Sequence, residues 1–378
     1  MALTIIKSPP TLIAARMPVV FQLTTDYTSL CHITGMVGTI GDSIEPDTAH
    51  KVTFELSDFV RDKPVLPASL TVPAIHAQAF PLQAFVFGER YGTPPTSHNE
   101  LTTSEYRIMP ARIPHWKHDF SGTINDYIVA HKPFLTWYPN QVRKVLPAEI
   151  IHLYYMVQDS VEYLYQLQFT VTYTDGTTAV FEGAYSGQAG EYEVVQLDAS
   201  PAIVLTWALT DEPTKTVAGY TVRAAYINDL SVVVPVSETR TFVINRLPYT
   251  NPRQLFFRNS YGTFDQLMLR GLGIINATTD RLTASRQAGY DGAQVPDRVT
   301  WYNQGRQTLA AETGYMLKAE TAWSNELLTS TEIYEVQGAV LVPVELRTEK
   351  MQQLNDDNAL ISVALEFEYL QTPVIESV

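Results

Sequence analysis

The stretch ISVALEFEY, residues Ile361–Tyr369, alternates large apolar residues with small or charged ones. A period of two is typical of a β-strand that buries one face. The stretch LQFTVTY, Leu167–Tyr173, repeats this pattern and runs into Asp175-Gly176 before a returning strand, Thr178–Phe181. An Asp-Gly pair favours a two-residue type I′ hairpin turn. The sequence therefore predicts a mainly β protein.

Composition indicates a folded, acidic protein with more than one domain. The chain has 378 residues, of which 45% are hydrophobic and 17% charged, and its formal net charge is -14 with a pI near 5.0. One core rarely organises so long a chain, so we expect two or three domains. Negative charge repels phosphate backbones and anionic lipid headgroups, so we expect neither nucleic acid nor a membrane as a partner.

Cysteine content and the amino-terminal sequence indicate the cellular compartment in which the protein folds. Cys31 is the only cysteine, so no intramolecular disulfide can form, and we expect it to act as a small buried hydrophobic residue. The apolar run within Met1–Pro10 is too short for a signal peptide, and no later segment approaches the ~18 apolar residues of a membrane-spanning helix. We therefore expect a protein made and folded in a cytoplasm.

Turn residues divide the first third of the chain into short strands, and we predict a β-sandwich domain over residues 1–133. In Gly88–Lys132, prolines and scattered polar residues leave no sustained period. A long stretch of this kind usually packs over a neighbour or carries an interaction. We predict a Pro-rich interaction arm, with folding over its own domain as the alternative. The expected strands before the arm are Val19–Leu23, His32–Thr34 and Lys51–Leu56.

Residues 134–248 are predicted to form a second sandwich, with about seven short strands separated by turns. The Cys…Trp…Cys framework of antibody domains is absent, which favours a fibronectin-like version of the immunoglobulin fold. Besides the Asp175-Gly176 hairpin, the expected strands are Leu153–Val157, Tyr220–Tyr226, Ser231–Val234 and Thr241–Ile244.

Residues 249–378 are predicted to form an α+β module, in which one helix packs on an antiparallel sheet. Lys318–Leu328 carries the only convincing helical stripe in the chain, and Trp323 on that stripe is expected in the core. The expected strands are Gln254–Phe257 and Gln266–Leu269, which flank Ser260-Tyr261-Gly262 as a hairpin, and Val340–Leu346 and Leu360–Tyr369, which pair around the loop Asn355–Asn358.

Candidate sites for chemistry are few, and each lacks a required part. His115 and His118 are the only close histidine pair, but no third metal ligand is adjacent to them. Gly271-Leu272-Gly273 begins like a dinucleotide fingerprint, yet Asn276 stands where the third glycine belongs, and the βαβ context is absent.

Other polar positions have simpler interpretations. Ser186 lacks the G-x-S-x-G spacing of a hydrolase nucleophile, and Asp356 and Asp357 lack the ligand spacing of a calcium loop. The sequon at Asn276 has no meaning without secretion. We therefore predict that the protein is not an enzyme, and assign it no catalytic, cofactor-binding or metal-binding residue and no cofactor. A hydrolase using His115 and His118 is the enzymatic alternative.

Several blocks of the sequence carry a resemblance to a known family. They are FLTWYP (Phe134–Pro139) followed by Arg143–Val145, VTYTDGT (Val171–Thr177), LFFRNSYGTFD (Leu255–Asp265), and a closing set made of Thr313–Tyr315, Trp323, Leu327–Ser330, Tyr334 and Val342–Val344. These blocks resemble tail and baseplate structural proteins of phages and prophages of Bacteroides-like bacteria. The first third matches more loosely, through Pro18–Phe21 and Ser57–Phe59.

The resemblance implies a structural subunit of a bacteriophage virion, in the tail or baseplate region and assembled in the bacterial host cytoplasm. Its partners would be other virion proteins and copies of itself in a symmetric assembly. The alternative from another class is a carbohydrate-binding or adhesin-type β-sandwich protein. The placement of Trp116, Trp137 and Tyr138 discriminates between them, since an exposed aromatic platform favours glycans and burial favours assembly.

Overall fold

The computed structural model confirms a mainly β protein with several sheets. Contacts divide the chain into two compact units: unit 1 comprises Met1–Asn245 with Asn259–Phe264, and unit 2 comprises Arg246–Arg258 with Asp265–Val378. The predicted domains, residues 1–133, 134–248 and 249–378, differ from these units and stay a prediction. The structure describes residues 3–9, 12–14, 19–26, 32–37, 40–56, 60, 70, 77–79, 82–91, 96–109, 124–131, 133–140, 142–158, 163–183, 188–285, 298–350 and 360–370.

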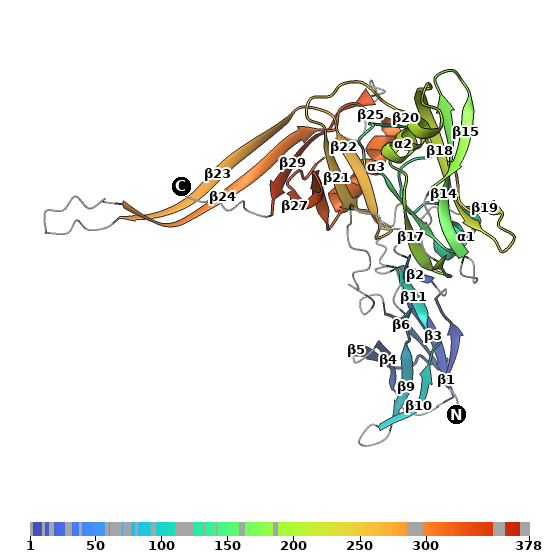
Figure 1. The fold of residues 1–378 in the computed structure, drawn as a ribbon. Coiled ribbons are helices and arrows are strands. Elements are labelled where there is room, and N and C mark those ends of the chain that lie inside the picture. The colour runs from blue at the N-terminus through green and yellow to red at the C-terminus, as the bar shows by residue number, and fades with distance from the viewer. Residues whose placement is uncertain are drawn as a thin grey trace. The chain divides into compact units, whose positions relative to one another are not determined.

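The first part of unit 1 is built from two main sheets that share one apolar core (Figure 1). Phe21 anchors this core, with its ring centroid 4.8 Å from that of Phe85 and 4.9 Å from that of Phe87. The first sheet has the order β1 (Leu3–Lys7), β3 (Val20–Thr25), β6 (Lys51–Glu55); the second has the order β10 (Thr96–Thr102), β9 (Val86–Tyr91), β4 (His32–Val37), β5 (Ile40–Ile44). A third sheet joins β2 (Leu12–Ala14), β11 (Tyr106–Met109) and β8 (Leu82–Gln83).

The prediction that Gly88–Lys132 lacks regular structure is wrong for most of its described residues. These form the end of β9, then β10, β11 and the helix α1 (Ile124–His131). The alternation escapes notice because β10 changes register against β9 between His98 and Leu101, where Asn99 has a positive φ of 47°. Trp116, His115 and His118 lie outside the described residues.

The rest of unit 1 places two sheets around a second core, which includes Phe134, Tyr155 and Phe169. The larger sheet has the order β12 (Arg143–Val145), β20 (Arg240–Ile244), β18 (Val217–Ile227), β14 (Tyr163–Tyr173), β15 (Thr178–Glu182), with β16 (Gln188–Ala189) against β14 and β19 (Val233–Pro235) against β18. The smaller one has the order β13 (His152–Met156), β17 (Glu193–Asp198), β7 (Ala77–Ala79).

The predicted hairpin at Asp175-Gly176 is confirmed, but the predicted turn type is wrong. Thr172 pairs with Thr178, the amide of Gly176 donates to the carbonyl of Tyr173, and only Gly176 has a positive φ, of 82°. A type I′ turn needs positive φ at both central residues. The chain instead makes a longer turn that places the glycine in the left-handed region.

The helix α2 (Pro201–Asp211) is absent from the predictions made from the sequence. Its sequence PAIVLTWALTD is apolar almost all round, so it shows no single stripe, and the proline at its start supplies a helical φ. Val204 and Ala208 are buried, while Trp207 stacks on Phe181 at 4.3 Å between ring centroids.

Unit 2 contains one large antiparallel sheet and the predicted helix, α3 (Lys318–Thr329). Trp323 is only 4% exposed; its Nε1 donates to Asp265 Oδ2 at 2.8 Å, and its ring lies 5.5 Å from that of Phe257. The strand order is β22 (Phe264–Leu269), β21 (Arg253–Arg258), β26 (Ile333–Gln337), β27 (Val340–Leu346), β29 (Ala364–Tyr369), β24 (Arg298–Glu312), β23 (Gly273–Ser285), and β25 (Met316–Leu317) pairs separately with β28 (Leu360–Ile361).

The alternation predicted for Ile361–Tyr369 is confirmed. Its odd-numbered residues are buried and its even-numbered ones are exposed or half-buried, although the strand is divided between β28 and β29. The expected pairing with Val340–Leu346 is also present, with Val344 opposite Tyr369.

Candidate functional site

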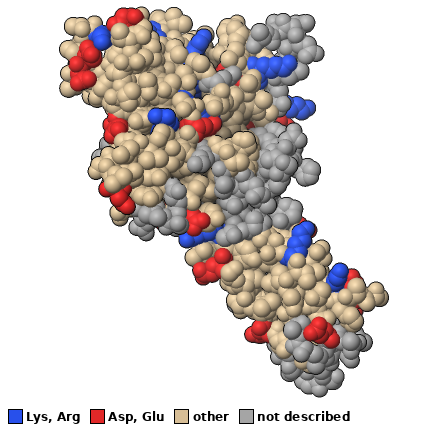
Figure 2. Space-filling view, turned by 90° about the vertical axis from the view of Figure 1, so that its right-hand side faces the viewer, with Lys and Arg blue, Asp and Glu red and all other residues tan. Residues whose placement is uncertain are grey.

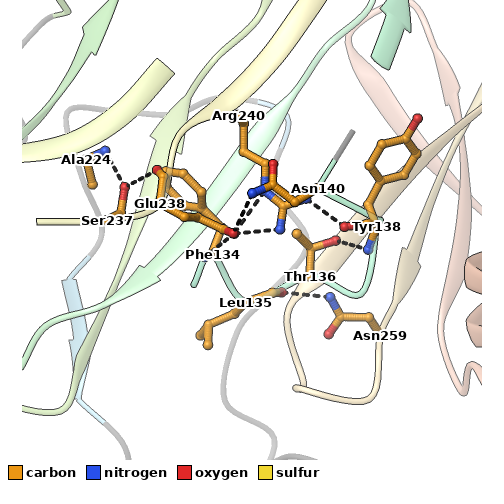
Figure 3. A network of polar contacts seen from close by, with 10 residues as sticks. All are labelled: Phe134, Leu135, Thr136, Tyr138, Asn140, Ala224, Ser237, Glu238, Arg240 and Asn259. Carbon is orange, nitrogen blue, oxygen red and sulfur yellow. Dashed lines mark hydrogen bonds and ion pairs between the residues drawn. The ribbon is translucent and has the colours of Figure 1, made fainter. Parts of the chain in front are cut away.

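The segment Phe134–Asn140 has no regular secondary structure, yet it is tied to unit 1 by a dense polar network (Figure 3). Glu238, in the loop before β20, accepts from the amide of Phe134 at 3.0 Å and from Asn140 Nδ2 at 3.3 Å. Its Oε1 also accepts from Arg240 Nε at 2.9 Å and Nη2 at 2.5 Å. One carboxylate therefore holds both ends of the segment.

Arg240 extends this network to the middle of the segment. Its Nη1 donates to the carbonyl oxygen of Tyr138 at 2.6 Å, and the amide of Tyr138 donates to Thr136 Oγ1 at 3.0 Å (Figure 3). The side chains of Arg240 and Glu238 are 8% and 17% exposed. A charged pair this far from water needs many partners, because each unmet polar group costs about 1–3 kcal/mol.

The turn Asn259–Phe264 contacts the same segment from the other side. The carbonyl oxygen of Leu135 accepts from Asn259 Nδ2 at 2.9 Å and from Thr263 Oγ1 at 2.6 Å. Asn259 Oδ1 in turn accepts from the amides of Tyr261 and Thr263 at 3.0 and 3.2 Å, which shapes the turn around it. Two blocks distant in sequence, FLTWYP and the NSYGTF turn, therefore meet in unit 1.

Trp137 is half-buried in this contact. Its ring stacks on Tyr261 at 4.6 Å between centroids and 15° between planes, and its Nε1 donates to Ser260 Oγ at 2.5 Å. Tyr138 is 8% exposed, with the guanidinium of Arg143 4.9 Å from its ring centroid. Neither aromatic side chain stands open as a platform for a sugar.

The electrostatics of this region follow from its burial. The pKa of Tyr127, on α1, is raised from its ordinary value chiefly by burial and next by the carboxylate of Glu238. Arg240 and a hydrogen bond with Tyr261 act in the opposite direction. Tyr127 therefore lies within electrostatic reach of the Glu238–Arg240 pair that holds the Phe134–Asn140 segment.

Few of the residues weighed for chemistry fall in the described part of the chain. Cys31, His115, His118, Ser186, Asp356 and Asp357 lie outside it. Asn276 and Gly273 lie on β23, and Gly271 precedes that strand. Among described residues, no group of three or more His, Cys, Asp or Glu side chains is placed to hold a metal ion. No described helix combines the length and apolar character needed to span a membrane.

A second region of interest is the two-stranded ribbon formed by β23 and β24. Their antiparallel register runs from Gly273 opposite Ala311 to Ser285 opposite Arg298. On its other side, β24 pairs with β29 only over Thr308–Glu312. From Ala277 onward the ribbon thus extends beyond the other strands of its sheet (Figure 1).

The strand β23 lies at the edge of this sheet, and β24 is its only partner among the described strands. Leu272, Ile274 and Ile275 are 77%, 62% and 50% exposed. Since successive side chains of a strand point to opposite faces, the two isoleucines expose apolar surface on both faces of the edge. An open backbone edge next to exposed apolar side chains is a ready place for another strand to pair.

Neither region is among the candidate sites that the sequence predicts. The Glu238 contacts join residues far apart in the chain, so no local pattern reveals them. For β23 a signal was present, because GIINATT, Gly273–Thr279, is an uncharged run rich in β-branched residues. Its glycines were considered only as a nucleotide motif.

The face drawn in Figure 2 has no patch of a single charge sign among its described residues. Acidic and basic side chains are interspersed there among a majority of uncharged ones. A phosphate-binding surface requires clustered basic residues, and this face does not present such a cluster among its described residues.

Comparisons with known proteins identify no family. No protein-family model matches the chain, and no curated protein matches it. A solved structure titled "Structural insight into host cell surface retention of a 1.5-MDa bacterial ice-binding adhesin" aligns over 95% of this chain and 93% of its own, at 8% identity and a TM-score of 0.18. A TM-score this low does not establish a shared fold.

Proposed function

We propose that the protein is a non-enzymatic structural subunit of a bacteriophage virion, in the tail or baseplate region, and acts through protein–protein contacts. In this proposal its sheets form immunoglobulin- or fibronectin-like sandwiches followed by an α+β module. The virion assignment rests on the sequence resemblance, whose FLTWYP and NSYGTF blocks lie against each other in unit 1. Contacts of this kind give those blocks a structural role.

The observation that carries a contact function is the β23–β24 ribbon. A two-stranded hairpin is at best marginally stable in water, because it has no third strand or helix to cover it. The ribbon continues past Ala277 without pairing to β29, and β23 keeps an open edge among the described strands. In an assembly, a neighbouring subunit could pack against the ribbon and cover the open edge of β23.

The carbohydrate-binding alternative gains no support from the described aromatic residues. Trp137 is stacked on Tyr261, and Tyr138 is buried. Trp116 lies outside the described residues.

Particle fractionation tests the proposal. We expect the protein to co-sediment with density-purified phage particles from a strain carrying its gene, and gold-labelled antibody to mark the tail end. Recovery only in the soluble fraction of lysates that contain intact particles would contradict the proposal. Binding of the purified protein to defined oligosaccharides on a glycan array would favour the alternative.

A further inference from the structure

We propose that β23 pairs edge to edge, in antiparallel orientation, with β23 of a second copy of this chain. The inference deepens the proposed function and rests on it, since it names the surface through which copies of the subunit meet. Main-chain hydrogen bonds would supply affinity, and the flanking side chains would set the register. The pairing would join two seven-stranded sheets into one continuous sheet.

The first seven residues of β23 distinguish it from the other edges, and its two charged residues, Asp280 and Arg281, come after them. Natural proteins block edge strands with charges, prolines or short length. Gly273–Thr279 has no charge and no proline over seven residues. The other edge strands of the larger sheets carry charge: Lys7 in β1, Asp42 in β5, Lys51 in β6, Glu100 in β10, Arg143 in β12 and Glu182 in β15.

The opposite edge of the same sheet is not available as the partner. Every residue of β22 is buried, so a second copy cannot add its β23 to β22 and form an open chain of subunits. The remaining partner with an equally long uncharged edge is β23 itself. Pairing of one patch with its own copy gives a closed two-fold dimer, the commonest symmetry of oligomers.

Charge also favours a second copy at this place. Residues 273–312 contain four arginines, at 281, 286, 298 and 306, and four acidic residues, at 280, 291, 297 and 312. Their formal sum is zero, so the net charge of -14 resides in the rest of the chain. Two copies repel each other through most of their length, but the ribbon can approach its own copy without that penalty.

The side chains of β23 are compatible with this arrangement. In a two-fold antiparallel pair, one residue faces itself, and its neighbours face each other in reversed order. With Asn276 on the axis, Ile275 would face Ala277 of the second copy and Ile274 would face Thr278. Each pair combines an apolar residue with a small or β-branched one, which suits cross-strand contact.

Cysteine scanning of the full chain tests the pairing. Single cysteines are placed at each position from Ile274 to Thr279 in a Cys31→Ser background. Because only the residue on the axis faces itself, we expect one position to give a rapid disulfide-linked dimer, while its neighbours do not. Cysteine at Val180, an exposed residue on the edge strand β15, is the matched control and should give no disulfide-linked dimer.

A charge variant gives a second readout. Asn276→Lys places like charges at the paired edge, and we expect the dimer dissociation constant in sedimentation velocity to rise by about tenfold or more. Val180→Lys should leave it unchanged. Circular dichroism and melting of each variant confirm that it is folded.

The outcomes separate the inference from the proposed function. Cross-linking at one β23 position together with a weakened Asn276→Lys dimer supports the inference. A chain that stays monomeric with no cross-link, a dimer that tolerates Asn276→Lys, or β23 cysteines that link only to a different protein would each overturn it. Any of these results, in a protein still found in particles, leaves the proposed function standing. Absence from particles overturns the proposed function itself.

Discussion

The Phe134–Asn140 segment and the β23–β24 ribbon differ in opposite ways: the first is irregular but has its hydrogen bonds satisfied within the chain, and the second is regular but has an uncovered edge among the described strands. The segment lacks regular secondary structure, but the chain satisfies it through Glu238, Arg240 and Asn259. The ribbon is regular over 13 residues of β23, yet it has an open edge among the described strands and exposes Ile274 and Ile275. Regular secondary structure therefore does not show which regions make all their contacts within one copy of the chain.

This difference points to separate roles for the two regions. Removing a partner from a satisfied polar network leaves a buried group without a hydrogen bond, so such changes lower stability. Changing an exposed edge residue alters little within one copy, so such changes affect association.

The largest effect is expected at Trp323, which tests whether the unit that carries the ribbon has a core of its own. Trp323→Ala removes the contact with Phe257 and the hydrogen bond to Asp265, and should lower the free energy of unfolding by about 3–5 kcal/mol. Chemical denaturation measures it. Trp323→Phe keeps most of the volume and should cost less. Melting of Trp323→Ala within a degree or two of wild type would refute the core assignment.

A smaller loss is expected at Glu238, which tests whether the Phe134–Asn140 segment depends on its polar network. Glu238→Ala leaves the buried guanidinium of Arg240 without its carboxylate, and should cost about 3 kcal/mol. The matched control is Glu212→Ala, which removes a more exposed pair with Lys215 at 3.3 Å and should cost under about 1 kcal/mol. Equal effects in the two variants would show that the network is dispensable.

Acid should affect stability and association differently. Burial lowers the pKa of His152 from 6.5 to about 4, with the carboxylate of Asp198 opposing the shift. The unfolded chain therefore binds more protons, so stability present at pH 7 is lost as pH falls from about 6.5 toward 4, by roughly 2 kcal/mol at pH 5. Gly273–Thr279 carries no titratable side chain, so dimerisation should change little between pH 7 and 5 while the chain stays folded.

Denaturation curves at pH 7 and pH 5 check this, with His152→Gln as the comparison. In the variant, the free energy of unfolding should fall less between pH 7 and pH 5 than in the wild type, by most of the roughly 2 kcal/mol that His152 contributes. If wild type and variant lose the same stability on acidification, His152 is not the group responsible.

The sequence predicts structure well where one face of an element is buried. Ile361–Tyr369 shows a clear period because water lies on one side only. On α3 the predicted core positions Trp323 and Leu327 are buried, but the predicted stripe also held Ala319 and Ala322, which are exposed, while Thr321, Ser324 and Glu326 are buried. The helix α2 gives no such signal, because PAIVLTWALTD is apolar almost all round. At β10 a change of register interrupts the alternation, so the sequence gives no signal for this strand. Whether residues 88–132 act as an interaction arm stays a prediction.

The two candidate regions show a different limit of sequence analysis. The contact between Glu238 and Phe134 spans 104 residues, so only the folded chain brings its members together. The edge of β23 was visible as an uncharged run, but whether it is covered depends on sheet order, which alternation does not reveal. Sequence indicates which residues suit a strand, and tertiary pairing decides which strand is left at an edge.

Hydrogen exchange of the full chain, compared at nanomolar and at high micromolar concentration, tests the central claim most directly. The account predicts that the amides of Phe134 and Leu135 are protected at both concentrations, because Glu238 and the carbonyl of Tyr154 accept from them. Within Gly273–Thr279, the amides that do not bond to β24 should exchange quickly in dilute protein and become protected on concentration. Protection of those amides already complete in the dilute monomer, or absent at every concentration, would contradict the account.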